Sequence, residues 1–152
     1  MPRITQVLLT LLVLSATQFC LAQNKNSIQG PNDLLVGLWE PADKDKRVLV
    51  QVFEDGRGRI AGKILGQYDE DGTYREAPPT QIPLLVEGFS YSEDGIWRDG
   101  QITDPEDGKN YSGRIKMLKK DLLEVRAYLG IFWKDMEWVK ADSPHPSLYS
   151  LK

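Results

Sequence analysis

The chain has 152 residues, with 19 Lys and Arg against 22 Asp and Glu, and only one Cys and one His. The slightly acidic balance, with charges interspersed along the chain, argues against a nucleic acid partner. Zinc and other transition metals favour Cys and His ligands, so neither such a metal nor another cofactor is expected.

Residues 1–22 have the pattern of a signal peptide. Arg3 supplies a basic start, residues 7–14 an apolar run, and Cys20 to Ala22 a small-residue exit. The run is too short and too polar at its end to span a bilayer, so no membrane span is expected. Phe19 stands where a lipoprotein signal needs a small side chain, so we do not expect lipid anchoring at Cys20. Without Arg3, the mature chain has a net charge of −4 and no Cys, and we expect it to be periplasmic or secreted.

The mature chain is expected to form one domain. Residues 23–33 are polar and lack an apolar period, which indicates a flexible lead-in. Residues 34–141 are expected to form the domain itself. Residues 142–152 contain Pro144 and Pro146, which cannot donate to a β-ladder, so a loose tail is expected.

The domain shows the marks of an all-β fold. Asp-Gly, which suits turns, occurs five times, beginning at Asp55, Asp71, Asp94, Asp99 and Asp107, and several of these should be hairpin tips. Period-two alternation of apolar residues lies between the turns. The eight predicted strands cover residues 35–40, 47–54, 58–65, 82–89, 95–102, 111–118, 122–129 and 134–139.

Eight sequential antiparallel strands are expected to close into an up-and-down barrel, because an open sheet would leave two edges and one uncovered face. A barrel of about eight strands is either filled by side chains or wide enough for one small ligand. Its inward rows are expected to include Val48, Val50, Val52, Ile64, Val125 and Met136.

Catalytic motifs are mostly missing from the sequence. His145 lies in the Pro-rich tail, and no Gly-x-Ser-x-Gly motif is present, so nucleophilic hydrolysis is not expected. The acidic turns near Gly72 and Gly108 lack the terminal carboxylate of an EF-type calcium loop and are interpreted as plain turns. An enzyme based on carboxylates is the least favoured of three hypotheses, and a buried acid with a raised pKa would support it.

Aromatic and basic side chains are the remaining candidates for ligand contact. We select Trp97, Tyr111, Arg126 and Tyr128, while noting that large rings also pack barrel cores and rims whatever the function.

Two stretches resemble known proteins. Gly37-Leu38-Trp39 is similar to the Gly-x-Trp motif of lipocalin-type barrels, in which the Trp ring lies beneath a basic side chain from the last strand. Lys140, which follows Trp138-Val139, is the position that matches, and Arg126 is the competitor.

The second stretch is more specific. Trp97, Gly100 and Ile102, followed by Asp104-Pro105, Asp107-Gly108-Lys109 and Tyr111, resemble the central motif of the bacterial domain-of-unknown-function family 2147. Residues 123–130, which end at Gly130, and Trp138 resemble its closing motif. The resemblance implies a small exported protein with a lipocalin-like, or calycin-like, barrel and no assigned activity. Ala127 departs from the pattern, in which a glycine would be expected, as does the short segment between Gly130 and Trp138.

Two hypotheses on function lead. The first is a periplasmic protein that binds a small, largely apolar ligand in the barrel, and it requires a void between the inward rows. The second is a structural or interaction module of the cell envelope, with a solid barrel and an envelope protein as partner. Its candidate surface is the long segment of residues 66–81, because a loop of that length is uncommon unless it is functional.

Overall fold

The computed structural model describes residues 30–43, 47–78 and 84–141. The predicted signal peptide, most of the predicted lead-in and the predicted tail lie outside these residues. The elements are a 3-10 helix η1 (Pro31–Leu34) and nine strands, β1 (Gly37–Pro41), β2 (Val48–Glu54), β3 (Ile60–Tyr68), β4 (Tyr74–Glu76), β5 (Leu84–Glu93), β6 (Ile96–Thr103), β7 (Asn110–Lys119), β8 (Leu122–Leu129) and β9 (Phe132–Lys140). No helix among the described residues is long and apolar enough to cross a membrane.

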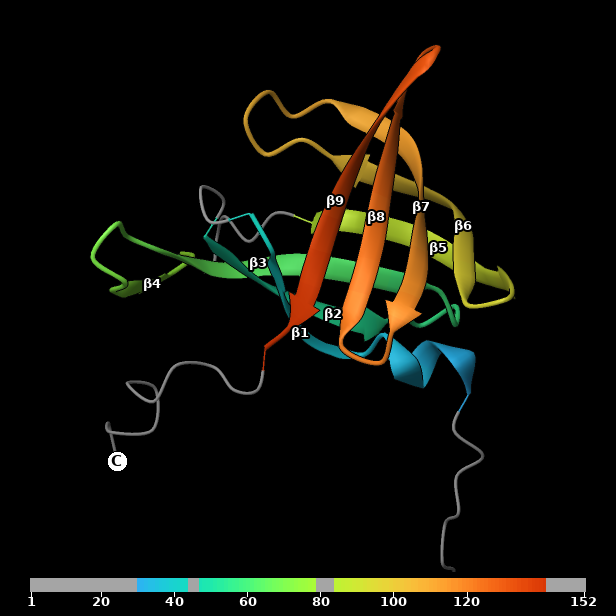
Figure 1. Ribbon diagram of the computed structural model, residues 1–152, viewed down its shortest axis with the longest axis horizontal. Coiled ribbons are helices and arrows are strands. Elements are labelled where there is room, and N and C mark those ends of the chain that lie inside the picture. The colour runs from blue at the N-terminus through green and yellow to red at the C-terminus, as the bar shows by residue number, and fades with distance from the viewer. Residues whose placement is uncertain (1–29, 44–46, 79–83, 142–152) are drawn as a thin grey trace, which may run out of the picture.

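The strands form a closed antiparallel barrel (Figure 1). Their hydrogen-bonded order is β2-β1-β9-β8-β7-β6-β5-β3-β4, and a further pairing of β2 with β3 closes the ring. Eight strands make the ring, while the short β4 pairs with β3 alone. Neighbours in the ring follow one another along the chain apart from β4, and β9 returns to β1. The predicted all-β, up-and-down barrel is therefore confirmed.

The barrel has a closed end and an open end. At the closed end lie η1, the start of β1 and the β2–β3, β5–β6 and β7–β8 turns. The core there is built from large side chains that are fully buried, including Trp39, Trp97, Phe89 and Leu35. The connections that follow β1, β3, β6 and β8 lie at the open end.

The first described residues belong to the barrel, in contrast to the flexible lead-in expected up to residue 33. Asn32, in η1, accepts a hydrogen bond from the Trp97 indole N–H at 2.8 Å. Its amide nitrogen donates to Glu54 Oε2 at 2.7 Å and to the Gly58 carbonyl at 3.0 Å. These three bonds attach η1 to β6 and to the β2–β3 turn.

The long segment after β3 contains β4, which the sequence did not predict. Three residues are too few to show an alternating pattern, and β4 depends on its pairing with β3 and on the contact between the Tyr68 and Tyr74 rings, whose centroids are 5.2 Å apart. The segment was also the expected interaction surface. None of its described residues, 66–78, is a large exposed hydrophobic side chain.

The fourth Asp-Gly pair lies inside β6 and makes a β-bulge, where the other four form turns. Asp99 has φ of 64°, which Asp tolerates better than most residues. The bulge brings Gly100 onto the Phe89 ring: a Cβ at Gly100 would lie 2.6 Å from Phe89 Cε2 and closer still to Cγ. The absence of a side chain therefore lets this ring fill the core.

Candidate functional site

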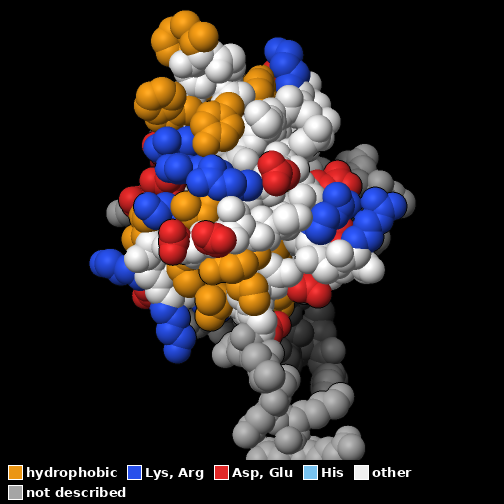
Figure 2. Space-filling view, turned by 90° about the vertical axis from the view of Figure 1, so that its right-hand side faces the viewer, with side chains coloured by type: hydrophobic (Ala, Val, Ile, Leu, Met, Phe, Trp, Pro, Cys, Tyr) orange, Lys and Arg blue, Asp and Glu red, His pale blue; other side chains and the backbone are white. Residues whose placement is uncertain are grey.

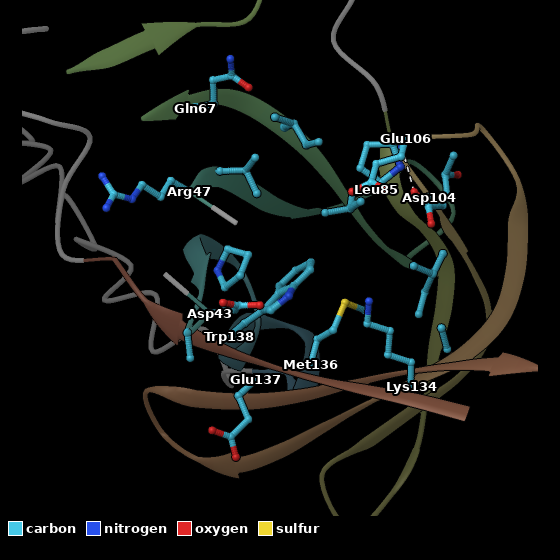
Figure 3. A pocket seen from close by; sticks show the side chains of 18 of the residues that line it. Asp43, Arg47, Gln67, Leu85, Asp104, Glu106, Lys134, Met136, Glu137 and Trp138 are labelled. Atoms are coloured by element: carbon cyan, nitrogen blue, oxygen red, sulfur yellow. Dashed lines mark hydrogen bonds between the residues drawn. The ribbon is translucent and has the colours of Figure 1, made fainter. Parts of the chain in front are cut away.

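A cavity of about 900 Å³ occupies the open end of the barrel (Figure 3). Its wall comes from all eight barrel strands and from the loops between them. The buried or half-buried apolar side chains that line its interior are Val48, Ile64, Leu85, Ile102, Ala127, Met136 and Trp138. The large rings of the core lie mostly toward the closed end, so the open end is left unfilled.

Alternation along β9 decides which of its side chains meet the cavity. Trp138 pairs with Leu123, Met136 with Val125, and Lys134 with Ala127, all on the inward face of β8. Figure 3 shows Met136 and Trp138 directed into the cavity, with Lys134 next to Met136, while Glu137 points away from it. Lys134 is exposed, and so it places an ammonium group at the mouth, above an apolar interior.

The rim of the cavity is polar and mainly acidic. Among the described residues, seven carboxylates border it, at Asp43, Asp69, Glu70, Asp104, Glu106, Asp135 and Glu137, against two cations, Arg47 and Lys134. Two of the carboxylates, Asp135 and Glu137, belong to the outward row of β9. Five described acids therefore remain at the mouth against Arg47 and Lys134, and one of the five, Asp69, is paired with Arg75. A negative field at the mouth disfavours an anionic ligand.

Arg47 and Tyr68 form the best-defined polar contacts of the rim. The Arg47 guanidinium donates to the carbonyl oxygens of Asp69 and Glu70, at 2.9 Å each, which fixes the end of the β3–β4 hairpin beside β2. The Tyr68 hydroxyl donates to Glu40 Oε1 at 3.0 Å. Burial and this hydrogen bond raise the pKa of Tyr68 to about 12, so its hydroxyl stays a neutral donor at ordinary pH.

Of the four predicted ligand-contacting residues, the structure places only Tyr111 at the cavity. Trp97 is fully buried toward the closed end, where its N–H is bonded to Asn32 and its ring packs edge-on against Tyr91 with centroids 5.1 Å apart. Trp97 is therefore a core residue and does not line the cavity, in contrast to the expected ligand contact.

Arg126 and Tyr128 also lie away from the cavity, on the outer face of β8. The Arg126 guanidinium makes two hydrogen bonds to the Asp135 carboxylate, at 2.5 and 2.7 Å, and lies over the Trp133 ring at 5.3 Å from its centroid. The hydrogen bond from Arg126 holds the pKa of Asp135 below its usual value. Tyr128 pairs with Trp133 across the strands. Period-two alternation explains why Arg126 and Tyr128 lie on the outer face, since Val125 and Ala127 point inward.

The motif residues have structural roles that the contacts make clear. Lys140 Nζ lies 5.3 Å from the Trp39 ring centroid, so Lys140, and not Arg126, is the cation over this Trp, as the lipocalin resemblance implies. Gly37 lies beside Lys140 and has φ of 140°, a backbone conformation that favours glycine. Gly130 opens the β8–β9 turn with φ of 70°.

The central motif forms the turn that follows β6, at the rim of the cavity. Asp104 Oδ1 accepts from the Glu106 N–H at 2.8 Å, and the Gly108 N–H donates to the Asp104 carbonyl, also at 2.8 Å. Asp107 accepts from the Lys109 N–H at 2.9 Å and forms an ion pair with Lys109 Nζ at 2.8 Å. The bonds from Lys109 lower the pKa of Asp107. The motif thus builds a rigid turn, of which Asp104 and Glu106 border the cavity.

Sequence reasoning missed Arg47, Tyr68 and Lys134 as cavity residues. Lys134 could have been found, because it lies two residues before Met136, which was expected to point inward. Arg47 and Tyr68 gave no such sign, since both lie at strand ends where alternation says little about direction.

The described residues offer few groups for other chemistry. No cluster of three or more His, Cys, Asp or Glu side chains that could hold a metal ion occurs in this part of the chain. Every resolved pKa shift of a described carboxyl group is downward, at Asp55, Asp71, Asp107 and Asp135. The cavity can therefore enclose the apolar part of a small molecule, and the polar side chains of the rim can contact the end that stays exposed.

A closed eight-stranded antiparallel barrel with a cavity at one end and a Trp–cation pair at the other defines the protein as a lipocalin-like barrel. It is similar to a solved structure from Helicobacter pylori, the protein HP1028, described as belonging to the lipocalin family, with 17% identity and a TM-score of 0.57 over 72% of this chain and 84% of that one. Residues 37–140 match the family described as "Uncharacterized protein conserved in bacteria (DUF2147)", and the chain belongs to this family. No curated protein sequence matches the chain.

Proposed function

We propose that the protein binds a small, largely apolar ligand inside the barrel, after export to the periplasm or out of the cell. The observation that carries the proposal is the cavity of about 900 Å³ with its apolar interior. Pockets for small molecules have volumes of about 300 to 1,000 Å³ and mainly apolar walls with a few polar groups. The signal-peptide pattern of residues 1–22 supports the location.

The main alternative is an interaction module of the cell envelope built on a solid barrel. A solid barrel requires inward rows that meet across the axis. The cavity lined by Ile64, Leu85 and Met136 supports the ligand-binding proposal over this alternative. We also propose binding in preference to catalysis, because the resolved shifts hold carboxyl groups ionised, where a general acid needs a raised pKa.

The charge of the rim narrows the class of ligand. Among the described residues, five acidic side chains, of which Asp69 is paired with Arg75, face Arg47 and Lys134, and this excess of acids favours a ligand whose polar end is neutral or cationic. A neutral or cationic amphiphile should therefore bind more tightly than a carboxylate with the same apolar chain. The difference should shrink in high salt, because the rim is open to solvent.

The first experiment is to purify the mature chain without denaturation, extract it with organic solvent and analyse the extract by mass spectrometry. A stoichiometric small molecule is the expected result. Fluorescent probes with neutral, cationic and carboxylate heads then test binding directly. An empty extract together with failure of all three probes would contradict the proposal.

A matched pair of variants tests where the probe binds. Ala127→Phe places a ring in the cavity and should weaken probe binding at least tenfold. Tyr128→Phe changes the next residue, on the outer face, and should leave binding unchanged. Equal affinity in both variants would mean that the probe binds outside the barrel.

A further inference from the structure

The tip of the β8–β9 hairpin carries the most exposed large hydrophobic side chains of the described residues. The exposed fractions are 86% for Ile131, 69% for Phe132 and 58% for Trp133, whereas no other large hydrophobic side chain in the described part of the chain exceeds 42%. The hairpin projects beyond the barrel (Figure 1), and Figure 2 shows hydrophobic side chains gathered at its end. These three residues and Leu129 are called the apolar tip below.

The turn itself does not require this composition. Leu129 pairs with Phe132, which leaves Gly130 and Ile131 as the two turn residues. The positive φ of Gly130 supplies the conformation that the turn needs, and the second position of such a turn commonly holds a polar residue. An Ile at that position makes the tip more apolar without serving the fold.

The side chains of the hairpin are ordered by distance from its end. Ile131 and Phe132, which carry no polar atom, lie outermost. Trp133 follows, with the Arg126 guanidinium over its ring, and then Lys134. An apolar end, followed by an aromatic ring with a polar edge and then by cations, is the order found for side chains at a membrane interface.

A second protein copy fits this tip less well than a lipid surface does. If each whole side chain offers about 150 to 250 Å², as aromatic side chains do, the four partly exposed side chains present roughly 400 to 600 Å². A stable interface needs about 800 Å² from each partner. A narrow, convex hairpin end cannot supply that area, but it is large enough to insert into the interface of a bilayer.

We propose that the apolar tip contacts a lipid bilayer by inserting Ile131 and Phe132 into the region between the headgroups and the acyl chains. Leu129 also lines the cavity, as does Lys134. The tip therefore stands at the mouth, and insertion brings the opening of the cavity to the lipid surface. The inference goes beyond ligand binding and does not require the cavity to be occupied.

The driving force is apolar rather than electrostatic. The mature chain is acidic, with a net charge of −4, and the rim beside the tip carries more carboxylates than cations. Attachment to anionic headgroups would thus be opposed by most of the open end. Contact should be weak and reversible, present on neutral lipid, and insensitive to salt.

Tryptophan fluorescence can report on this contact. The chain has four Trp, of which Trp39, Trp97 and Trp138 are at most 2% exposed, so Trp133 alone responds to a change of solvent at the surface. The mature chain is mixed with phosphatidylcholine vesicles, and flotation is measured together with emission. We expect co-flotation, a blue shift of the emission and quenching by brominated lipid, all of which persist at about 1 M salt.

Matched variants separate the tip from other exposed apolar residues. Ile131→Ser and Phe132→Ser, singly and together, should lower co-flotation, at least tenfold in the double variant, while near-ultraviolet circular dichroism stays unchanged. Leu118→Ser, at the opposite end of the barrel, should float like the wild type. Equal flotation of the double variant and the wild type would overturn the proposal.

Two other outcomes would also overturn it. Binding only to vesicles with phosphatidylglycerol, lost at high salt, would indicate headgroup attraction through Arg126 or Lys134. No binding to either vesicle, together with self-association that Phe132→Ser abolishes in sedimentation, would make the tip a protein contact.

Discussion

Asn32→Ala should destabilise the barrel by about 2 to 3 kcal/mol, although Asn32 lies before the first strand. The substitution removes the acceptor of the Trp97 N–H, and Trp97 is fully buried. A buried donor left without a partner costs about 1 to 3 kcal/mol. Loss of the two bonds from Asn32 to Glu54 and Gly58, which are exposed, adds about 0.5 to 1 kcal/mol.

Urea denaturation followed by far-ultraviolet circular dichroism measures the effect as a shift of the midpoint at constant slope. The same substitution is then made in a Trp97→Phe background. A Phe ring has no N–H, so the cost of Asn32→Ala should fall by about 1 kcal/mol or more there. A cost below about 0.5 kcal/mol in the wild type, or an equal cost in both backgrounds, would refute the reasoning.

Gly100→Ala should cost about 1 to 3 kcal/mol in the same assay, because its Cβ would overlap the Phe89 ring; an unchanged midpoint would show that the ring can move aside. Lys140→Met should cost about 0.5 to 1 kcal/mol by removing the cation over Trp39, and a more stable variant would contradict this. Tyr68 has a folded pKa of about 12 against 10.0 for the free side chain, so its contribution to stability is present below pH 10.0 and is lost as the pH rises through about 12. The free energy of unfolding, measured over this range, should fall less steeply in Tyr68→Phe than in the wild type, and identical slopes would count against the assignment.

The strands were predictable because their determinants are local. Leu122–Leu129 has the same bounds in the structure as in the sequence prediction, since alternation and the flanking turns both act over a few residues. Closure followed from the strand count, because eight strands without covering helices leave unpaired edges unless the ring closes. The Lys140 contact with Trp39 followed from the family resemblance.

The candidate site was predicted less well, for two different reasons. Arg126 was chosen for its chemistry, although the alternation that turns Val125 inward turns Arg126 outward, so the sequence already contained the correction. The role of Asn32 could not be predicted in this way. Its bond to Trp97 joins residues 65 positions apart, and such a pairing depends on the closed barrel. The cavity likewise depends on which volumes remain empty once distant strands have met.

Closure between β1 and β9 sets the order of events when the chain is made. The pairing places Trp39 opposite Lys140, so the first strand waits for almost the whole domain before it gains its second neighbour. Contacts between positions so distant make folding slow compared with helical proteins. A chain that ends before β9 would leave β1 and β8 as unpaired edges, available to other chains and prone to aggregate. Once the last nine-residue strand is complete, the barrel can close, and β1 and β8 are no longer unpaired edges through which the chain could aggregate.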